Sequence, residues 1–192
     1  MAGPIVHING WPGTGKLTIA RELARLLDAR LLDNHSILDP AHALFDRRDP
    51  LHHSLRRSLR AAVFDHLRRM QPQTALLFTD ALSEDAHDVA VFDEYRQLAG
   101  DRAAPLVAVV LDIDAERNLE RLTAVGRSER HKLTNPKILA ALRANHRLLR
   151  ATGLPLVELD VSELSPAEAA GILSRHIATA LESDPKPPSP TS

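Results

Sequence analysis

The chain contains no cysteine and few aromatic residues. Its 192 residues include one tryptophan, one tyrosine and four phenylalanines, so aromatic side chains make up only 3%. Without cysteine, disulfides, thiolate metal sites and cysteine nucleophiles are excluded. The scarcity of aromatic rings, together with a formal net charge of −1, argues against a surface that binds nucleic acid.

The sequence also lacks a long apolar run and an N-terminal signal pattern. A membrane-spanning helix needs about 20 consecutive apolar residues, so we expect a cytoplasmic protein without membrane contact. Hydrophobic residues make up 44% of the chain, and its length suits one domain with a sizeable core. We expect that domain over 1–183, and the Pro-rich stretch 184–192 predicts a disordered tail.

The most informative segment is residues 4–18, PIVHINGWPGTGKLT. An apolar run typical of a strand enters a glycine-rich turn, and an amphipathic helix pattern follows at once. This is the G-x-x-x-x-G-K part of a P-loop in its strand–loop–helix setting. Glycine lets backbone N–H groups point inward at phosphate, and the lysine supplies a cation for the β- and γ-phosphates. The predicted nucleotide-binding residues are Gly10, Trp11, Pro12, Gly13, Thr14, Gly15, Lys16, Leu17 and Thr18.

One position departs from the P-loop motif. The residue after Lys16 is normally Ser or Thr, whose hydroxyl ligates magnesium, and here it is Leu17. Thr18 follows, where small P-loop kinases often carry a second hydroxyl that reaches the α-phosphate. We therefore expect the α-phosphate contact to be kept and the direct magnesium ligand to be lost. Magnesium can still be held through waters and carboxylates.

Short apolar runs alternate with helical patterns along the rest of the chain. This alternation predicts a parallel sheet covered by helices on both faces, with ligands beyond the carboxyl ends of its strands. Strands are expected at 5–8, 30–33, 75–79, 106–111 and 156–159. Helices are expected at 16–27, 39–45, 49–70, 85–99, 115–124 and 136–151, and a last one opens in SELSPAEAAGIL.

With these residues in view, the chain resembles the small P-loop kinases of the nucleoside-monophosphate-kinase-like superfamily, such as shikimate kinase, gluconate kinase and chloramphenicol phosphotransferase. The resemblance covers about residues 4–182 in element order, and the P-loop is its specific motif. It implies an α/β fold, a three-layer αβα P-loop NTPase with a five-stranded parallel sheet in the order 2-3-1-4-5. It also implies a helical substrate-binding region at about 34–72, an Arg-bearing lid at about 125–136, the cofactors ATP and Mg²⁺, and a small-molecule acceptor.

The resemblance gives Asp33 the part of the carboxylate that accepts the proton of the acceptor hydroxyl. Phosphoryl transfer depends on a positioned nucleophile and neutralised phosphate charge, and a carboxylate at this strand end can orient a hydroxyl. Asn34 and His35, which follow it, are expected to contact the substrate. The alternative is that Asp33 only caps the next helix and that His35 is an ordinary polar loop residue.

Asp80 ends the third predicted strand, in LLFTDA. In the resembling kinases a carboxylate at this place holds magnesium, usually through water. With Leu17 lacking a hydroxyl, Asp80 is expected to carry more of that task. The alternative is a carboxylate that caps the following helix.

Arginines supply the remaining candidates. The resemblance places Arg121, Arg127 and Arg130 at the lid, where Arg121 is expected to bind the nucleotide and Arg127 and Arg130 to act in catalysis. Arginine over a transferring phosphoryl group stabilises its charge and excludes water. On the long helix at 49–70, Arg57 and Arg60 are expected to bind substrate, with Arg56 beside them. The alternative for each is a solvated surface charge.

The leading hypothesis is an ATP-dependent phosphotransferase that moves the γ-phosphoryl group to a hydroxyl of a metabolite, nucleoside or antibiotic. A nucleotide kinase is the nearest enzymatic alternative. Leu17 motivates a different class, a regulatory nucleotide-binding protein with weak or no transfer. The near-neutral charge disfavours a kinase that acts on nucleic-acid ends. Oligomeric state stays open.

Overall fold

A computed structural model describes residues 2–123 and 135–183. A five-stranded, wholly parallel sheet has the order β2-β3-β1-β4-β5, as predicted. The strands are β1 (Ile5–Gly10), β2 (Arg30–Asp33), β3 (Leu76–Thr79), β4 (Leu106–Asp112) and β5 (Leu156–Asp160). The helices are α1 (Lys16–Leu26), α2 (His35–Leu44), α3 (Pro50–Arg69), α4 (Ala86–Asp101), α5 (Ala115–Thr123), α6 (Pro136–Asn145) and α7 (Pro166–Ser183).

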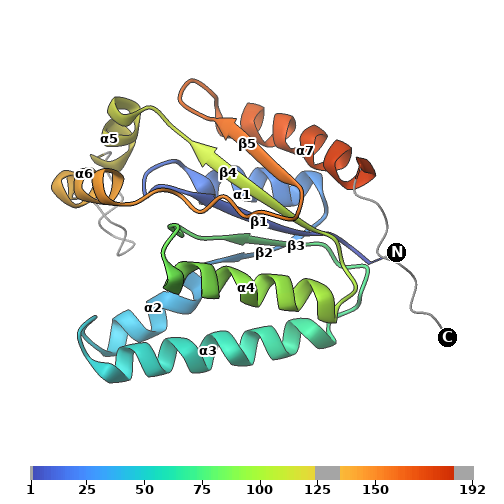
Figure 1. The fold of residues 1–192 in the computed structure, drawn as a ribbon, viewed down its shortest axis with the longest axis horizontal. Coiled ribbons are helices and arrows are strands. Elements are labelled where there is room, and N and C mark those ends of the chain that lie inside the picture. Colours follow the sequence, from blue (N-terminus) through green and yellow to red (C-terminus); the bar gives the residue numbers. More distant parts are fainter. Residues whose placement is uncertain (1, 124–134, 184–192) are drawn as a thin grey trace.

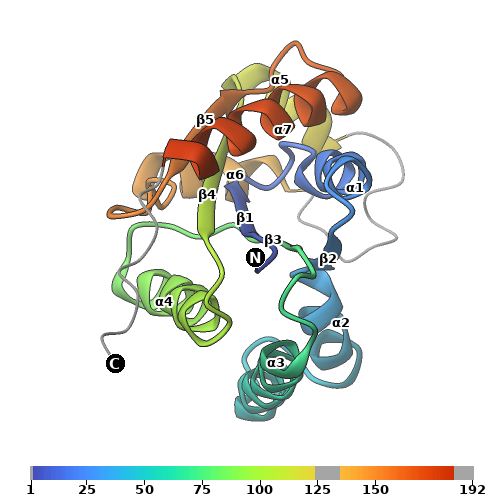
Figure 2. The same cartoon turned by 90° about the vertical axis from the view of Figure 1, so that its right-hand side faces the viewer.

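Helices cover the sheet in three layers (Figures 1 and 2). One face packs against α1 and α7, where Val6, Val107 and Val109 meet Leu23 and Leu173. The opposite face packs against α3 and α4. Because helices cover both faces, β1, β3 and β4 read as nearly continuous apolar runs, which is usual for buried parallel strands. Each fully buried aliphatic side chain contributes about 1.5–3 kcal/mol.

The carboxyl ends of the strands form one edge, beside which α5 and α6 lie in Figure 1. That edge also receives the start of α2, which begins at His35, four residues before the predicted position. The helix forms early because the backbone carbonyl of Asn34 accepts hydrogen bonds from the amides of Ile37 and Leu38. Pro40 stands within the helix.

Helix α6 ends at Asn145, six residues before the predicted end. The next residues pair with the segment that follows β3 instead of continuing the helix. The amide of Glu84 donates to the carbonyl of Arg147 at 3.0 Å, and the amide of Leu149 donates to the carbonyl of Leu82 at 2.9 Å. These backbone bonds compete directly with the helical ones, so the helix stops.

The last helix has the N-terminal signal that the sequence suggests. The Ser165 amide donates to the Glu168 carboxylate at 2.9 Å, and the Glu168 amide donates back to Ser165 Oγ at 3.3 Å. This reciprocal capping box, followed by Pro166 at the helix start, explains why α7 begins there. In the described part of the chain, no helix is long and apolar enough to cross a membrane.

At the opposite end of the sheet, Arg102 holds the end of α3. Its side chain is only 6% exposed. The guanidinium donates to five backbone carbonyl oxygens, those of Leu67, Met70, Gln71, Pro72 and Thr74, at 2.5–3.3 Å. A cation suits this place because the C-terminal carbonyls of a helix carry partial negative charge.

Replacing Arg102 by alanine is therefore expected to lower the free energy of unfolding by about 3 kcal/mol, since buried carbonyls lose a charged donor. Urea unfolding followed by circular dichroism measures the change. The matched control is Arg69→Ala, because Arg69 is exposed and forms an ion pair with Asp65 on the same helix. Equal stabilities of the two variants would contradict the assigned role of Arg102.

Candidate nucleotide and phosphoryl-transfer site

The predicted P-loop residues 10–15 connect the end of β1 to the start of α1. Gly13 and Gly15 have φ angles of 99° and 86°, a region that side chains with a Cβ rarely adopt. A Cβ on Gly13 would lie 2.4 Å from Asn118 Nδ2. Gly15 precedes α1 without a side-chain cap, so the backbone amides of the first turn face the loop. This geometry suits an anion such as a phosphate.

Lys16 lies across this loop. Its Nζ donates to the carbonyls of Gly10 and Trp11 at 2.6 and 2.9 Å, and Thr14 Oγ1 donates to the Trp11 carbonyl at 2.9 Å. The fold thus brings together every P-loop residue named from the sequence. Leu17 is half-buried and Thr18 is exposed at the first turn of α1.

Two residues that were not identified from the sequence contact the P-loop region from α5 and α6. Asn118 on α5 is fully buried, and its Nδ2 donates to the Pro12 carbonyl at 2.9 Å. Arg143 on α6 donates to Asn118 Oδ1 at 3.2 Å, and its guanidinium lies 5.7 Å from the centre of the Trp11 ring. Trp11 therefore packs against α6. The local sequence around Asn118 and Arg143 gave no signal for this contact.

Arg121 lies between the P-loop and the connection from β5 to α7. It donates to the Thr14 carbonyl at 3.3 Å and to the carbonyls of Val161 and Ser162 at 2.9 Å. Arg121 is thus beside the phosphate loop, and its assignment to the nucleotide stays a prediction. Arg127 and Arg130 lie outside the described residues, as does most of the region assigned to the lid. Asn135 and Pro136, at its end, begin α6.

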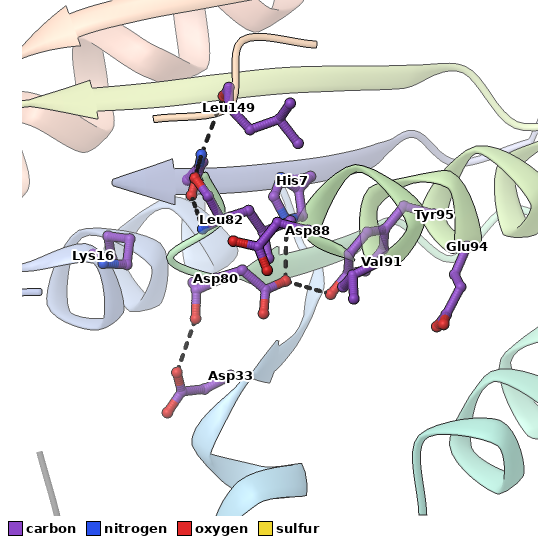
Figure 3. A network of polar contacts seen from close by, with 12 residues as sticks. His7, Lys16, Asp33, Asp80, Leu82, Asp88, Val91, Glu94, Tyr95 and Leu149 are labelled. Carbon is purple, nitrogen blue, oxygen red and sulfur yellow. Dashed lines mark hydrogen bonds and ion pairs between the residues drawn. The ribbon is translucent and has the colours of Figure 1, made fainter. Parts of the chain in front are cut away.

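Asp33 ends β2 at the same edge of the sheet. Its Oδ1 accepts a hydrogen bond from Thr79 Oγ1 at 2.8 Å, which fixes the carboxylate between β2 and β3 (Figure 3). Asn34 directly precedes α2, and its amide donates to the Thr79 carbonyl at 3.2 Å. His35 Nδ1 lies 3.2 Å from Asp39 Oδ1. Asp33 is half-buried, so its other oxygen has access to a ligand.

Asp80 is buried in a polar network. Its Oδ2 accepts from Tyr95 Oη at 2.5 Å and lies 3.0 Å from His7 Nε2 (Figure 3). Burial acts to raise the pKa of Asp80, but the hydrogen bond and charge of His7, the Arg60 charge and the Tyr95 hydroxyl outweigh it, so this pKa is lowered. Burial and the Asp80 charge raise the pKa of Tyr95.

These partners occupy Asp80 Oδ2, so this oxygen does not fit a direct magnesium ligand. Only 3% of its surface is exposed, and one carboxylate oxygen already accepts two hydrogen bonds. Leu17 supplies no hydroxyl, and the described residues contain no group of three His, Asp or Glu side chains able to hold a metal ion.

The lowered pKa of Asp80 gives a prediction for stability. Because its folded-state pKa lies below the ordinary 3.8, its charge stabilises the fold above about pH 4, and that contribution is lost as the pH falls further. Asp80→Asn is expected to be less stable than the parent at pH 7 and to show a flatter loss of stability in acid. Thermal unfolding from pH 7 to pH 3 measures both. A parallel pH dependence in the two proteins would contradict the prediction.

The arginines of α3 have different surroundings. Arg57 is exposed, whereas Arg60 forms an ion pair with Glu94 and stacks 4.6 Å from the Phe64 ring and 4.8 Å from the Tyr95 ring. Burial opposes the charge of Arg60, but Tyr95, Asp80 and Glu94 raise its pKa. Arg57 and Arg60 line a cavity of about 630 Å³ between α3 and α4. Arg60 is therefore already partnered within the protein.

Asn9, also missed from the sequence, shapes the edge between the P-loop and β3. Its Nδ2 donates to the carbonyls of Leu82 and Leu149 at 2.9 and 3.1 Å, and its Oδ1 accepts from the Leu82 amide at 2.8 Å. A cavity of about 220 Å³ lies beside these segments. Its lining includes Trp11, Pro12, Ser83, Asp88, Leu142 and His146.

Comparison with known proteins agrees with this geometry. The AAA domain family matches residues 6–139. Shikimate kinase from Corynebacterium efficiens is 30% identical over 132 residues, which cover 62% of this chain and 78% of that enzyme. A putative kinase from Chloroflexus aurantiacus j-10-fl superposes with a TM-score of 0.69 at 16% identity, covering 93% of this chain and 98% of that one.

Shikimate kinase from Acinetobacter baumannii, solved with shikimate, has a TM-score of 0.56 at 19% identity, covering 92% of this chain and 94% of that one. At these identities the solved structures show the fold alone. Membership in a family is shown by the match to the AAA domain family and by the 30% identity to the shikimate kinase of Corynebacterium efficiens. The chain belongs to the AAA domain family and to the nucleoside-monophosphate-kinase-like group of small P-loop kinases.

Proposed function

We propose that this protein transfers the γ-phosphoryl group of ATP to a hydroxyl group of a small molecule. The observation that carries the proposal is the common position of Lys16 and Asp33. Both lie at the carboxyl edge of one parallel sheet. Lys16 follows β1 through the P-loop, Asp33 ends β2, and the single strand β3 lies between β1 and β2. Such an edge is where ligands bind in open α/β sheets.

In this proposal the P-loop amides and Lys16 hold the triphosphate. Lys16 leaves the carbonyls of Gly10 and Trp11 and turns to the β- and γ-phosphates, which are stronger acceptors because they are charged. Arg121, next to Thr14, contacts the nucleotide from the side of the β5–α7 connection. Arg127 and Arg130 close over the transferred group. No guanine-specific motif is found in the sequence, which favours ATP.

Asp33 orients the acceptor hydroxyl and accepts its proton. Its hydrogen bond from Thr79 keeps the carboxylate in place, so that little reorganisation is needed when the proton arrives. The acceptor lies between α2 and α3, which make up most of the substrate-binding region proposed at 34–72. The kinase names of the relatives support this assignment.

A pooled acceptor panel tests the proposal. The purified full-length protein is incubated with γ-labelled ATP, magnesium and pools of sugars, nucleosides, nucleotides, hydroxy acids and antibiotics. Label is expected to move to one pool, and the positive pool separates a metabolite or antibiotic kinase from a nucleotide kinase. ATP binding without transfer to any pool would reject the proposed activity for these acceptor classes.

The same panel bears on a second candidate, a nucleotide-binding protein without efficient transfer. Leu17 and the buried, fully bonded oxygen of Asp80 favour it, because neither offers magnesium a direct ligand.

Leu17→Ser is expected to raise turnover at least tenfold if the site is a weakened kinase. A loss of turnover would mean that the site works with leucine. Leu26→Ser, a change at an exposed leucine at the far end of α1, controls for the loss of an apolar side chain. Initial rates of acceptor phosphorylation at several magnesium concentrations measure the effect.

A further inference from the structure

The Trp11–Pro12 segment of the P-loop is held by contacts from three helices. From the start of α1, Lys16 Nζ donates a hydrogen bond to the Trp11 carbonyl at 2.9 Å. From α5, Asn118 Nδ2 donates to the Pro12 carbonyl at 2.9 Å. From α6, the guanidinium of Arg143 lies 5.7 Å from the centre of the Trp11 ring. Separate parts of the chain therefore restrain the same two residues.

Asn118 and Arg143 form one unit across α5 and α6, which lie side by side near the carboxyl edge of the sheet (Figure 1). Asn118 is fully buried, and its Oδ1 accepts a hydrogen bond from Arg143 Nη1 at 3.2 Å. Both terminal nitrogens of Arg143 also donate to the Ile113 carbonyl at 3.2 Å. Because a guanidinium can only donate, Arg143 fixes Asn118 Oδ1 toward itself and leaves Nδ2 for the Pro12 carbonyl.

The contact with α5 falls where the backbone of the loop is unusual. Gly13, which follows Pro12, has a φ angle of 99°. A Cβ added there would lie 2.4 Å from Asn118 Nδ2 and 3.1 Å from the Asn118 carbonyl oxygen, so glycine allows this approach. The direction of the loop amides depends on this backbone conformation. The position of Asn118 is therefore coupled to the geometry that receives a phosphate.

Nucleotide binding is expected to remove one of the three restraints. A phosphate oxygen is a stronger acceptor than a carbonyl because it is charged, so Lys16 turns from the Trp11 carbonyl to the phosphates. Asn118 has no such alternative, since it is fully buried and both ends of its amide are bonded. Once the nucleotide is bound, the restraint on the segment therefore depends more on the contacts from α5 and α6.

We propose that Asn118 and Arg143 are positioning residues of the nucleotide site, which keep the Trp11–Pro12 segment in its binding conformation after Lys16 has turned to the phosphates. They act through the loop and do not touch the nucleotide themselves. This proposal rests on the nucleotide binding in the proposed function, but not on transfer to an acceptor. Because the segment is held before and during the reaction, the contacts favour ATP affinity and leave the chemical step unchanged.

Asn118→Ala removes both hydrogen bonds of the amide without changing the charge. It is expected to weaken ATP binding about tenfold, the effect of losing a buried hydrogen bond, while kcat at saturating ATP stays near the parent value. Isothermal titration with ATP and magnesium measures the affinity, and initial rates with the acceptor found by the panel measure kcat. Asn145→Ala, at an exposed asparagine that ends α6, is the matched control. A lower melting temperature with parent-like ATP affinity would mean that Asn118 serves the fold alone, which would overturn the proposal.

Arg143 requires a test that separates position from charge, because any cation near a triphosphate favours its binding. Arg143→Lys keeps the charge but loses the planar fork that joins Asn118 to Ile113. It is expected to bind ATP several-fold more weakly than the parent and to add little to the loss in Asn118→Ala, because the two side chains act as one unit. Arg175→Lys, at an exposed position of α7, is the control. Parent-like affinity of Arg143→Lys, or full additivity in the double variant, would reject the role assigned to Arg143.

A measurement on the parent protein needs no variant to fold. Trp11 is the only tryptophan of the chain, so tryptophan emission reports this segment alone. Acrylamide quenching of that emission measures how far the ring is exposed to solvent. Saturating ATP is expected to leave the quenching constant of the parent unchanged or lower, and to raise it in Asn118→Ala. A rise in the parent would show that the segment leaves α6 as the nucleotide binds, which contradicts the proposal.

The outcomes for this proposal and for the proposed function differ. Absence of ATP binding in the parent would overturn both. Weakened ATP binding in Asn118→Ala without transfer to any acceptor pool would support the positioning role and reject the kinase. Parent-like ATP binding in Asn118→Ala, together with transfer to one pool, would support the kinase and reject the positioning role.

Discussion

Lys16→Ala is expected to lower phosphoryl transfer by at least about 10²- to 10³-fold, the usual loss when one charge-stabilising donor is removed from a preorganised site. In the structure Lys16 Nζ lies within 3 Å of the carbonyls of Gly10 and Trp11, at the centre of the phosphate loop. Without it the loop keeps its glycine geometry but loses its cation. ATP affinity is therefore expected to fall less than turnover.

Two measurements separate these effects. Isothermal titration with ATP reports binding, and single-turnover transfer of labelled phosphate reports the chemical step. Lys137→Ala is the matched control, because Lys137 lies exposed on α6 and its side chain has no part in the proposed site. Parent-like transfer by Lys16→Ala with an unchanged melting temperature would refute the P-loop assignment.

Much of the fold follows from the sequence because local and long-range signals agree. The apolar runs that become β1, β3 and β4 are buried on both faces, so their composition alone identifies them as interior strands of a parallel sheet. The order of the strands came from the resemblance carried by the P-loop. The predicted ends of helices were wrong where hydrogen bonds to distant residues set them. At the end of α6, for example, Arg147 and Leu149 pair with residues 82–84.

The site was predicted less completely. The P-loop is local, so its residues could be named from a contiguous motif. The contacts that hold it are not local, because Asn118 and Arg143 reach Pro12 and Trp11 from helices more than 100 residues away. Nothing in their immediate sequence distinguishes them from surface residues.

His7 and Asn9 did carry a signal, since they are polar residues inside an apolar strand. Such residues are tolerated only when they have partners. His7 meets Asp80, and Asn9 meets the backbone of Leu82 and Leu149. Their partners lie 73 to 140 positions along the chain, so the pattern predicts that partners exist without naming them. Asp80 was singled out for a metal, but His7 and Tyr95 already occupy one of its oxygens.

Asp33→Asn is expected to reduce transfer by about 10²- to 10⁴-fold, the range for loss of a general base. The change is nearly isosteric, and the amide oxygen can still accept the Thr79 hydroxyl, so the end of β2 should keep its position. Only the capacity to take the acceptor proton is removed. We therefore expect ATP binding and the melting temperature to stay at their parent values while kcat falls.

The control for this substitution is Asp65→Asn, because Asp65 is exposed on α3 and pairs with the exposed Arg69. If Asp33→Asn transfers phosphate at the parent rate, the carboxylate only anchors β2 to β3 and another group receives the proton. If binding of ATP falls together with transfer, Asp33 acts through the shape of the site and not through its basicity.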